Sequence, residues 1–233
     1  MPTIAQNNNS PIFIVGAARS GTTLLQYMLR SHPDISLPTA ESHFFIPFYN
    51  EVNRFGDLRN IENLRYLLKE IYQFRPSFFD DDVHGIKFDI ENLAKKFHQQ
   101  KLTSLPQIIS GIFLANAHAE GKSRWGDKTP YYILHLDTII EMFPDAKIIH
   151  VIRDGRDNSI SMLERKWDLQ IFNTYHAAYL WKKYVSAGKD FSLKHPDSYF
   201  EIRYEDILNH PEVSIQKLCD FLKIEFSHTI INF

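Results

Sequence analysis

The feature that most constrains the fold is a glycine-framed loop near the start of the chain, within "IFIVGAARSGTTLL" (residues 12–25). The apolar run before Gly16 predicts a buried strand, and the apolar residues after Gly21 recur at helical spacing. The loop fits the frame G-x-x-x-x-G-K-[ST] of phosphate-binding loops, except that Thr22 stands in the lysine position. Because backbone N–H groups and a helix N-terminus face the same point, this strand–loop–helix unit predicts an anion cradle.

The side chains of the loop suit an anion as well as its backbone does. Arg19 adds a fixed positive charge, while Thr22 and Thr23 add hydroxyl donors. The alternative is an ordinary strand–helix turn built from small residues. The frame alone does not identify the ligand.

A second group of anion-binding residues follows a later strand, in "VIRDGRDNSISMLER" (151–165). Arg153 stands at the strand end, where ligands of parallel sheets collect. Ser161 lies about two helical turns later, and Arg165 four residues after it. Arginine with a hydroxyl is a suitable clamp for a second phosphate. The alternative is that the charges at 153–157 pair with one another on the surface.

The rest of the chain predicts an α/β fold, with a mainly parallel central sheet flanked by helices. Residues 40–120 are mostly helical by pattern, apart from a loop at 76–85. The expected strands cover 11–15, 146–154 and 199–207. The expected helices cover 22–33, 60–74, 92–100, 105–121, 127–144, 155–167, 174–191 and 210–224.

Length and composition favour one soluble domain. The 233 residues suit a single domain over 11–233, after a polar and disordered segment at 1–10. A net charge of −2 argues against general nucleic-acid binding, so an anion site has to be local. The only cysteine, Cys219, excludes a disulfide within the chain. No signal peptide and no apolar run of about 20 residues is found, so we expect a cytoplasmic protein.

No metal site is expected. No spacing of histidine, aspartate and glutamate suggests one, and the acidic run at 80–82 is interpreted as a solvated turn.

The two anion motifs together resemble those of sulfotransferases that use 3′-phosphoadenosine 5′-phosphosulfate (PAPS). The resemblance extends over residues 11–224 and is greatest to the bacterial and tyrosylprotein branch, with "SHPDISLPTAES", "GDKTP" and "RYEDIL" in the same order. It implies a P-loop-like nucleotide-binding core that binds PAPS and releases 3′,5′-phosphoadenosine (PAP), without a metal. The implied 5′-phosphosulfate residues are Arg19, Ser20, Gly21, Thr22 and Thr23, and the implied 3′-phosphate residues are Arg153, Ser161 and Arg165, with Tyr204 also contacting the nucleotide.

The resemblance also implies catalytic residues. Glu41, in "PTAES", is the expected general base, with His43 as a reserve candidate. Lys128, in "GDKTP", would neutralise the leaving phosphate oxygen, and Arg19 would stabilise the transferred group. Phenol- and steroid-type relatives carry a histidine base two residues after that lysine. Here Pro130 occupies the place and cannot accept a proton, which favours Glu41.

The acceptor stays open. A carbohydrate, a lipid, a small alcohol or a peptide tyrosine would each supply a hydroxyl, with no nucleic acid and no membrane span involved. We expect residues 40–120 to form the acceptor side, where several aromatic side chains are either pocket or core (Phe44, Phe45, Phe48, Tyr49, Phe78 and Phe79). The sequence stops soon after the last shared helix, which is consistent with a short form or a truncation. The alternatives to a sulfotransferase are an atypical P-loop kinase and a catalytically inactive nucleotide-binding module.

Overall fold

The computed structural model describes residues 10–79, 85–165 and 171–232, and these residues separate into two compact units. The sheet unit comprises the chain up to Pro33 and from Lys128 onward. The helical unit comprises Asp34–Asp127. The acidic run at 80–82 and residues 1–9 of the expected disordered N-terminus lie outside the described residues. The helical unit corresponds to the helical segment expected at about 40–120.

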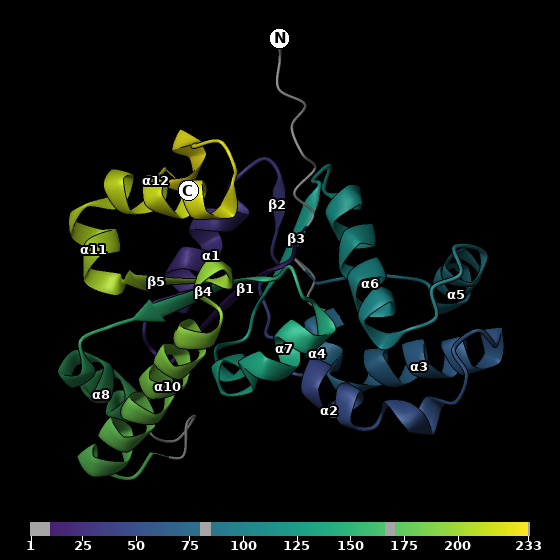
Figure 1. Ribbon diagram of the computed structural model, residues 1–233, viewed down its shortest axis with the longest axis horizontal. Helices are drawn as coiled ribbons and strands as arrows, with labels where there is room; N and C mark the ends of the chain where they lie inside the picture. The colour runs from purple at the N-terminus through teal and green to yellow at the C-terminus, as the bar shows by residue number, and fades with distance from the viewer. Residues whose placement is uncertain (1–9, 80–84, 166–170, 233) are drawn as a thin grey trace. The chain divides into compact units, whose positions relative to one another are not determined.

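The sheet unit is built on three parallel strands with β4 in the centre. β1 (Ile12–Gly16) pairs with β4 (Lys147–Ile152) in the register Ile12 to Lys147, and β4 pairs with β5 (Tyr199–Arg203). All five residues of β1 are buried, which explains their apolar character. Helices cover both faces: α1 and α12 lie on one side of these strands and α10 on the other (Figure 1). The helices are α1 (Thr22–Arg30), α7 (Leu136–Met142), α8 (Gly155–Glu164), α10 (Thr174–Lys194), α11 (Tyr204–Asn209) and α12 (Pro211–Leu222), with 3₁₀ turns at Pro130–His135, Pro196–Ser198 and His228–Ile230.

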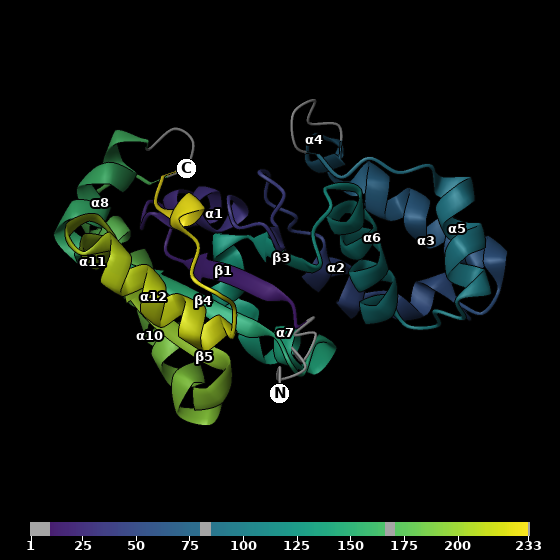
Figure 2. The same cartoon turned by 90° about the horizontal axis from the view of Figure 1, so that it is seen from above.

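The C-terminal part of the described chain packs back onto the first helix. The 3₁₀ turn at His228–Ile230 lies beside α1 (Figure 2). A ring nitrogen of His32, just after α1, lies 3.0 Å from the backbone carbonyl oxygen of Glu225. The C-terminal part of the described chain thereby packs against the helix that begins at the glycine loop.

The helical unit has an aromatic core. α3 packs on α5. The sequence pattern puts Ile61, Leu64, Leu67, Leu68 and Ile71 on one face of α3; the last four are fully buried, and Ile61, in the first turn, is partly buried. Phe45, Phe113 and Trp125 form a cluster with ring centroids 4.7 to 6.5 Å apart. The elements are β2 (Ile35–Ser36), α2 (Phe45–Asn50), a 3₁₀ turn (Val52–Phe55), α3 (Ile61–Phe74), α4 (Pro76–Phe79), α5 (Ile90–Gln99), α6 (Leu105–Ala119) and β3 (Arg124–Lys128), with β2 and β3 parallel.

The fold class is confirmed as α/β with parallel strands flanked by helices, but four local predictions were wrong. The loop expected at 76–85 begins with the one-turn helix α4, Pro76–Phe79. Two strands, β2 and β3, were missed because β2 has two residues and β3 reads "RWGDK", which is polar in sequence yet fully buried. The expected helix at 127–144 is a 3₁₀ turn followed by a short α-helix. The third expected strand ends at Arg203, so Tyr204 is the first residue of α11 rather than a strand residue.

Candidate active site

The glycine loop presents the uncapped N-terminus of α1. Gly21 is the N-cap residue, in the left-handed region with φ 94°, and it offers no side-chain cap. The first N–H groups of a helix have no acceptor inside the helix, and α1 carries no acidic residue in its first turn. Thr22 is buried and Thr23 is exposed at this end. The loop therefore offers backbone donors and a helix dipole to an anion.

The two anion motifs, 142 residues apart in sequence, meet in space within the sheet unit. Nε of Arg19 donates to the hydroxyl of Ser161 over 3.2 Å. Nη1 of Arg153 donates to the backbone carbonyl of Arg19 over 3.3 Å. Because the hydroxyl of Ser161 accepts from Arg19, its own proton is left to donate. Arg153 and Ser161 are thus both hydrogen-bonded to Arg19, in the loop that leads into α1.

Asn158 holds these two motifs together and was missed in the sequence. It is fully buried, and its amide nitrogen donates to the carbonyl of Ala18 over 2.9 Å and to the hydroxyl of Ser20 over 3.1 Å. Its neighbours Arg153 and Ser161 were singled out because they carry a charge and a hydroxyl. The sequence around it, "RDNSISM", carries no signal that separates Asn158 from a solvent-exposed helix asparagine.

Tyr204 contacts both motifs. The guanidinium carbon of Arg153 lies 4.9 Å from the centre of the Tyr204 ring, within the range of a cation–π contact. A Cβ atom on Gly21 would lie 2.3 Å from Cδ2 of the same ring, so only glycine fits there. The loop glycine is thus required by this contact as well as by its φ angle.

The strand end that carries Arg153 is fixed by several hydrogen bonds. The indole N–H of Trp181 donates to the carbonyl of Arg153 over 3.0 Å, and the N–H of Asp154 donates to Glu205 over 2.8 Å. Arg156 pairs with Asp154, and this hydrogen-bonded pair holds the pKa of the Asp154 carboxyl well below its ordinary value. Surface pairing, the alternative for this charged stretch, therefore holds for Arg156 but not for Arg153.

These residues fit a ligand with two anionic groups. Nε of Arg153 is buried and has no hydrogen-bond partner among the described residues. A buried guanidinium N–H without an acceptor is costly, and an anionic oxygen would satisfy it. A nucleotide with phosphates on O3′ and O5′ carries both on one ribose, so its two phosphate sites have to be adjacent, as Arg19 and Ser161 are.

The remaining predicted residues of the sheet unit occupy different environments. Lys128 is the last residue of β3 and only 5% exposed, so it is a buried strand residue and not a solvated lysine at a helix start. Arg165 is the exposed C-cap of α8, four residues after Ser161. Tyr204 is half-buried at the start of α11.

Glu41 and His43 lie in the helical unit, in the segment that leads into α2. Nε2 of His43 lies 2.8 Å from Oε2 of Glu41, and both side chains are about a third exposed. Glu41 is therefore neither buried nor a freely solvated surface carboxylate. The imidazole of His43 contacts the Glu41 carboxylate, which remains accessible to solvent.

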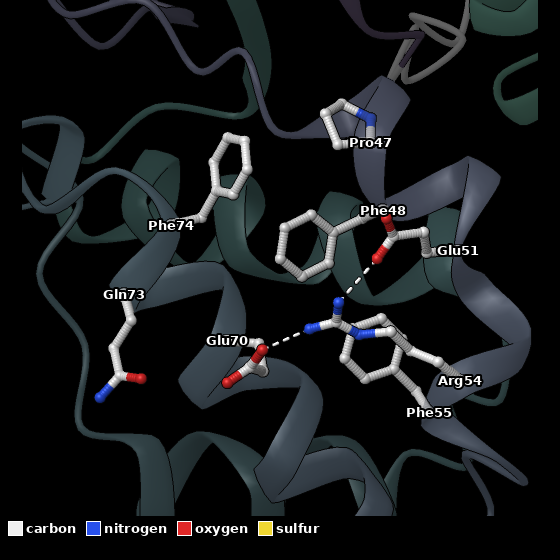
Figure 3. A pocket seen from close by; sticks show the side chains of 8 residues that line it. All are labelled: Pro47, Phe48, Glu51, Arg54, Phe55, Glu70, Gln73 and Phe74. Carbon is white, nitrogen blue, oxygen red and sulfur yellow. Dashed lines mark hydrogen bonds and ion pairs between the residues drawn. The ribbon is translucent and has the colours of Figure 1, made fainter.

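The helical unit also contains a cavity of about 370 Å³ with aromatic walls (Figure 3). Phe48 and Phe55 stack with their ring centroids 5.5 Å apart, and Arg54 bridges Glu51 and Glu70 at the rim. Of the six aromatic residues considered for the acceptor side, Phe48 lines this cavity. Phe44, Phe45, Phe78 and Phe79 are fully buried core residues.

Within the described residues, no group of three or more histidine, cysteine, aspartate or glutamate side chains is arranged to hold a metal ion. Among the helices of those same stretches, none combines the length and the apolar character that crossing a bilayer requires.

A sequence model of the sulfotransferase family matches residues 11–228. The chain is 26% identical over 234 residues to protein-tyrosine sulfotransferase 1 of Danio rerio, and 26% identical over 235 residues to that of Homo sapiens. Each match covers 99% of this chain, which spans 58% and 56% of those relatives. Two solved structures share the fold at 24% identity: the sulfotransferase domain of the Synechococcus PCC 7002 olefin synthase, with a TM-score of 0.63, and that of the curacin pathway, with 0.60. They cover 100% and 95% of this chain, and 79% and 76% of their own chains.

Proposed function

Because the chain belongs to the sulfotransferase family, we propose that it transfers the sulfuryl group of PAPS to an acceptor hydroxyl, with Glu41 as the general base. The observation that supports this most directly is the 3.2 Å contact between Arg19 and Ser161, which joins the two anion motifs. A nucleoside triphosphate needs no second phosphate site beside its loop, whereas a nucleotide phosphorylated on both O3′ and O5′ does.

The donor is bound through the residues of the sheet unit. The 5′-phosphosulfate is held by the backbone N–H groups of the loop and by Ser20, Gly21, Thr22 and Thr23. The first N–H groups of α1 are suited to this because the N-cap supplies no side-chain acceptor and the first turn has no acidic residue. Arg153 and Ser161 hold the 3′-phosphate, with Arg165 following on the same helix. Tyr204 supports the guanidinium of Arg153 from its ring face.

The transfer is an in-line displacement, by analogy with phosphoryl transfer. Glu41 takes the proton of the acceptor hydroxyl, and the acceptor oxygen forms a bond to sulfur. The bond from sulfur to the bridging phosphate oxygen breaks, and its electron pair leaves with PAP. Lys128 and Arg19 offset the charge that grows on the departing and equatorial oxygens. These two cations supply the positive charge for this role without a metal.

The relatives named protein-tyrosine sulfotransferases favour a peptide tyrosine as the acceptor. The phenol of tyrosine has a lower pKa than the hydroxyl of a carbohydrate or a small alcohol. A carboxylate base therefore removes the proton more easily from a tyrosine than from those other acceptors.

Calorimetry with PAP, without magnesium, tests the donor site. We expect binding that weakens by about 10- to 100-fold in Arg153→Met, since a charge-assisted hydrogen bond contributes about 1.5–3 kcal/mol. Arg156→Met is the matched control, because Arg156 lies three residues after Arg153, in the first turn of α8, but its side chain is 88% exposed and paired with Asp154. Equal weakening by both substitutions, or no binding of PAP, would contradict the proposal. Binding of ATP that requires magnesium would support the kinase instead.

Transfer from ³⁵S-labelled PAPS to a tyrosine peptide, a sugar and a simple alcohol tests the reaction. We expect Glu41→Gln to reduce transfer to a small residual rate and to leave PAP affinity unchanged, because Gln retains the shape but accepts no proton. A wild-type protein that binds PAP and transfers to none of the acceptors would be the inactive binding module.

A further inference from the structure

Glu41 and His43 form a carboxylate–imidazole pair whose geometry is imposed by the chain around it. The side chains at 42 and 44 have no exposed surface, whereas those of Glu41 and His43 are 31% and 29% exposed. This alternation anchors the segment through Ser42 and Phe44 and puts Glu41 and His43 together on the accessible side.

The backbone at His43 is in an unfavourable conformation. Its φ is 55°, in the left-handed region that glycine adopts most readily, and it turns the chain into α2 at Phe45. A glycine at position 43 would make the same turn without strain. A side chain kept at such a position is a reason to look for a use of that side chain.

Resting on the proposed function, we propose that His43 is the positioning residue of Glu41: its Nε2–H donates to Oε2 and fixes the plane and direction of the carboxylate. The carboxylate then takes the acceptor proton as the acceptor oxygen bonds to sulfur, the bond from sulfur to the bridging phosphate oxygen breaks, and its electron pair leaves with the phosphate. His43 exchanges no proton with the acceptor. The pair separates the two tasks of a general base: the imidazole holds the carboxylate, and the carboxylate reacts.

The kinetic test replaces His43 by glycine, which removes the imidazole and relieves the left-handed strain. We expect kcat to fall by about 10- to 100-fold, the range of other supporting interactions, with the donor KM unchanged and the unfolding midpoint not lowered. Lys101→Gly is the matched control, because Lys101 is an exposed residue of the same unit with φ 57°. It should relieve similar strain and leave kcat unaffected. His43→Gln, which keeps an N–H donor on a side chain of similar length, should recover most of the lost kcat.

Coupling to Glu41 distinguishes positioning from a general structural role. In a Glu41→Gln background, His43→Gly should cause no further loss of the residual rate, because the group it orients is already unable to accept a proton. An unchanged kcat in His43→Gly, an additive loss in the double variant, or a lowered unfolding midpoint would each overturn the proposal.

A second measurement needs no acceptor. Long-range ¹H–¹⁵N spectra of the imidazole rings at about pH 9, where histidine is neutral, report which nitrogen carries the proton. The signal that disappears in His43→Gly identifies the residue, and we expect it to show the Nε2–H tautomer, lost in Glu41→Ala, which removes the acceptor. An Nδ1–H tautomer would overturn the positioning role even if transfer is observed. Absent PAP binding would instead reject the proposed function, whatever the tautomer.

Discussion

Replacement of Gly21 by alanine tests whether the glycine loop and Tyr204 form one unit. Two separate costs arise. A residue with a Cβ in the left-handed region costs about 1–2 kcal/mol. The new Cβ would also lie 2.3 Å from Cδ2 and 2.8 Å from Cε2 of Tyr204, and overpacking of this kind costs about 1–3 kcal/mol. We therefore expect the free energy of unfolding to fall by about 2–5 kcal/mol in Gly21→Ala.

A double-mutant cycle separates the two costs. In Tyr204→Ala the ring is absent, so Gly21→Ala should cost only the backbone share, and the coupling energy should be about 1–3 kcal/mol. Gly121→Ala provides the matched control, because Gly121 has φ 72° and its added Cβ would have no neighbour within 4 Å. It should cost about 1–2 kcal/mol.

Urea unfolding of the four proteins of the cycle, and calorimetry with PAP on the same samples, are the measurements. We expect Gly21→Ala to weaken PAP binding as well, because a displaced Tyr204 ring no longer supports Arg153. Two outcomes would refute the contact between Gly21 and Tyr204. One is a loss of unfolding free energy in Gly21→Ala that equals the loss in Gly121→Ala, and the other is an equal loss with and without the Tyr204 ring. Either result would also remove the argument that Tyr204 belongs to the site.

Two further substitutions test how the sheet unit is held together. Asn158→Leu should reduce the free energy of unfolding by about 1–3 kcal/mol, because Ser20 and the Ala18 carbonyl lose their donor; an unfolding curve like that of the wild type would contradict this. Burial lowers the pKa of His150 to about 3, with a smaller contribution from the charge of Lys189. The unfolded chain binds this proton near pH 6.5 but the folded protein does not, so stability is complete above that pH and decreases as the pH falls from about 6.5 toward 3. Between pH 8 and pH 5 the loss attributable to His150 is about 2 kcal/mol, and His150→Gln, measured by urea unfolding at both pH values, should show a correspondingly smaller decrease. Equal decreases in the two proteins would show that His150 does not carry the effect.

The sequence was sufficient to predict the elements that position the residues proposed to bind the donor. The apolar runs of β1 and β4 are continuous because both strands are buried along their length, and such runs are visible without a structure. The loop frame and the spacing from Arg153 to Ser161 placed both anion motifs at the ends of those strands. The contact between Arg19 and Ser161 follows from the parallel pairing of β1 with β4, which brings the two strand ends together.

Other parts of the site were not predictable because their residues carry no pattern. β3 reads as polar, and its burial depends on packing that no local periodicity expresses. Asn158 resembles any helix asparagine until its two acceptors, on a loop 138 to 140 residues away, are known. The pairing of His43 with Glu41 occurs where a non-glycine residue has a left-handed backbone, which sequence propensity disfavours.

The two units divide the chemistry in a way that can be tested. Arg19, Arg153, Ser161 and Tyr204 are joined by contacts made within the sheet unit, whereas Glu41 and its partner His43 belong to the helical unit. Donor binding then depends on hydrogen bonds and helix N-terminal groups that substitutions at Glu41 and His43 leave in place. Substitutions at 41 and 43 should change kcat at constant PAP affinity, while Arg153→Met changes PAP affinity first. A loss of PAP affinity in Glu41→Gln as large as that in Arg153→Met would mean that the base and the donor site are not separate, and the assignment of Glu41 to the acceptor side would fail.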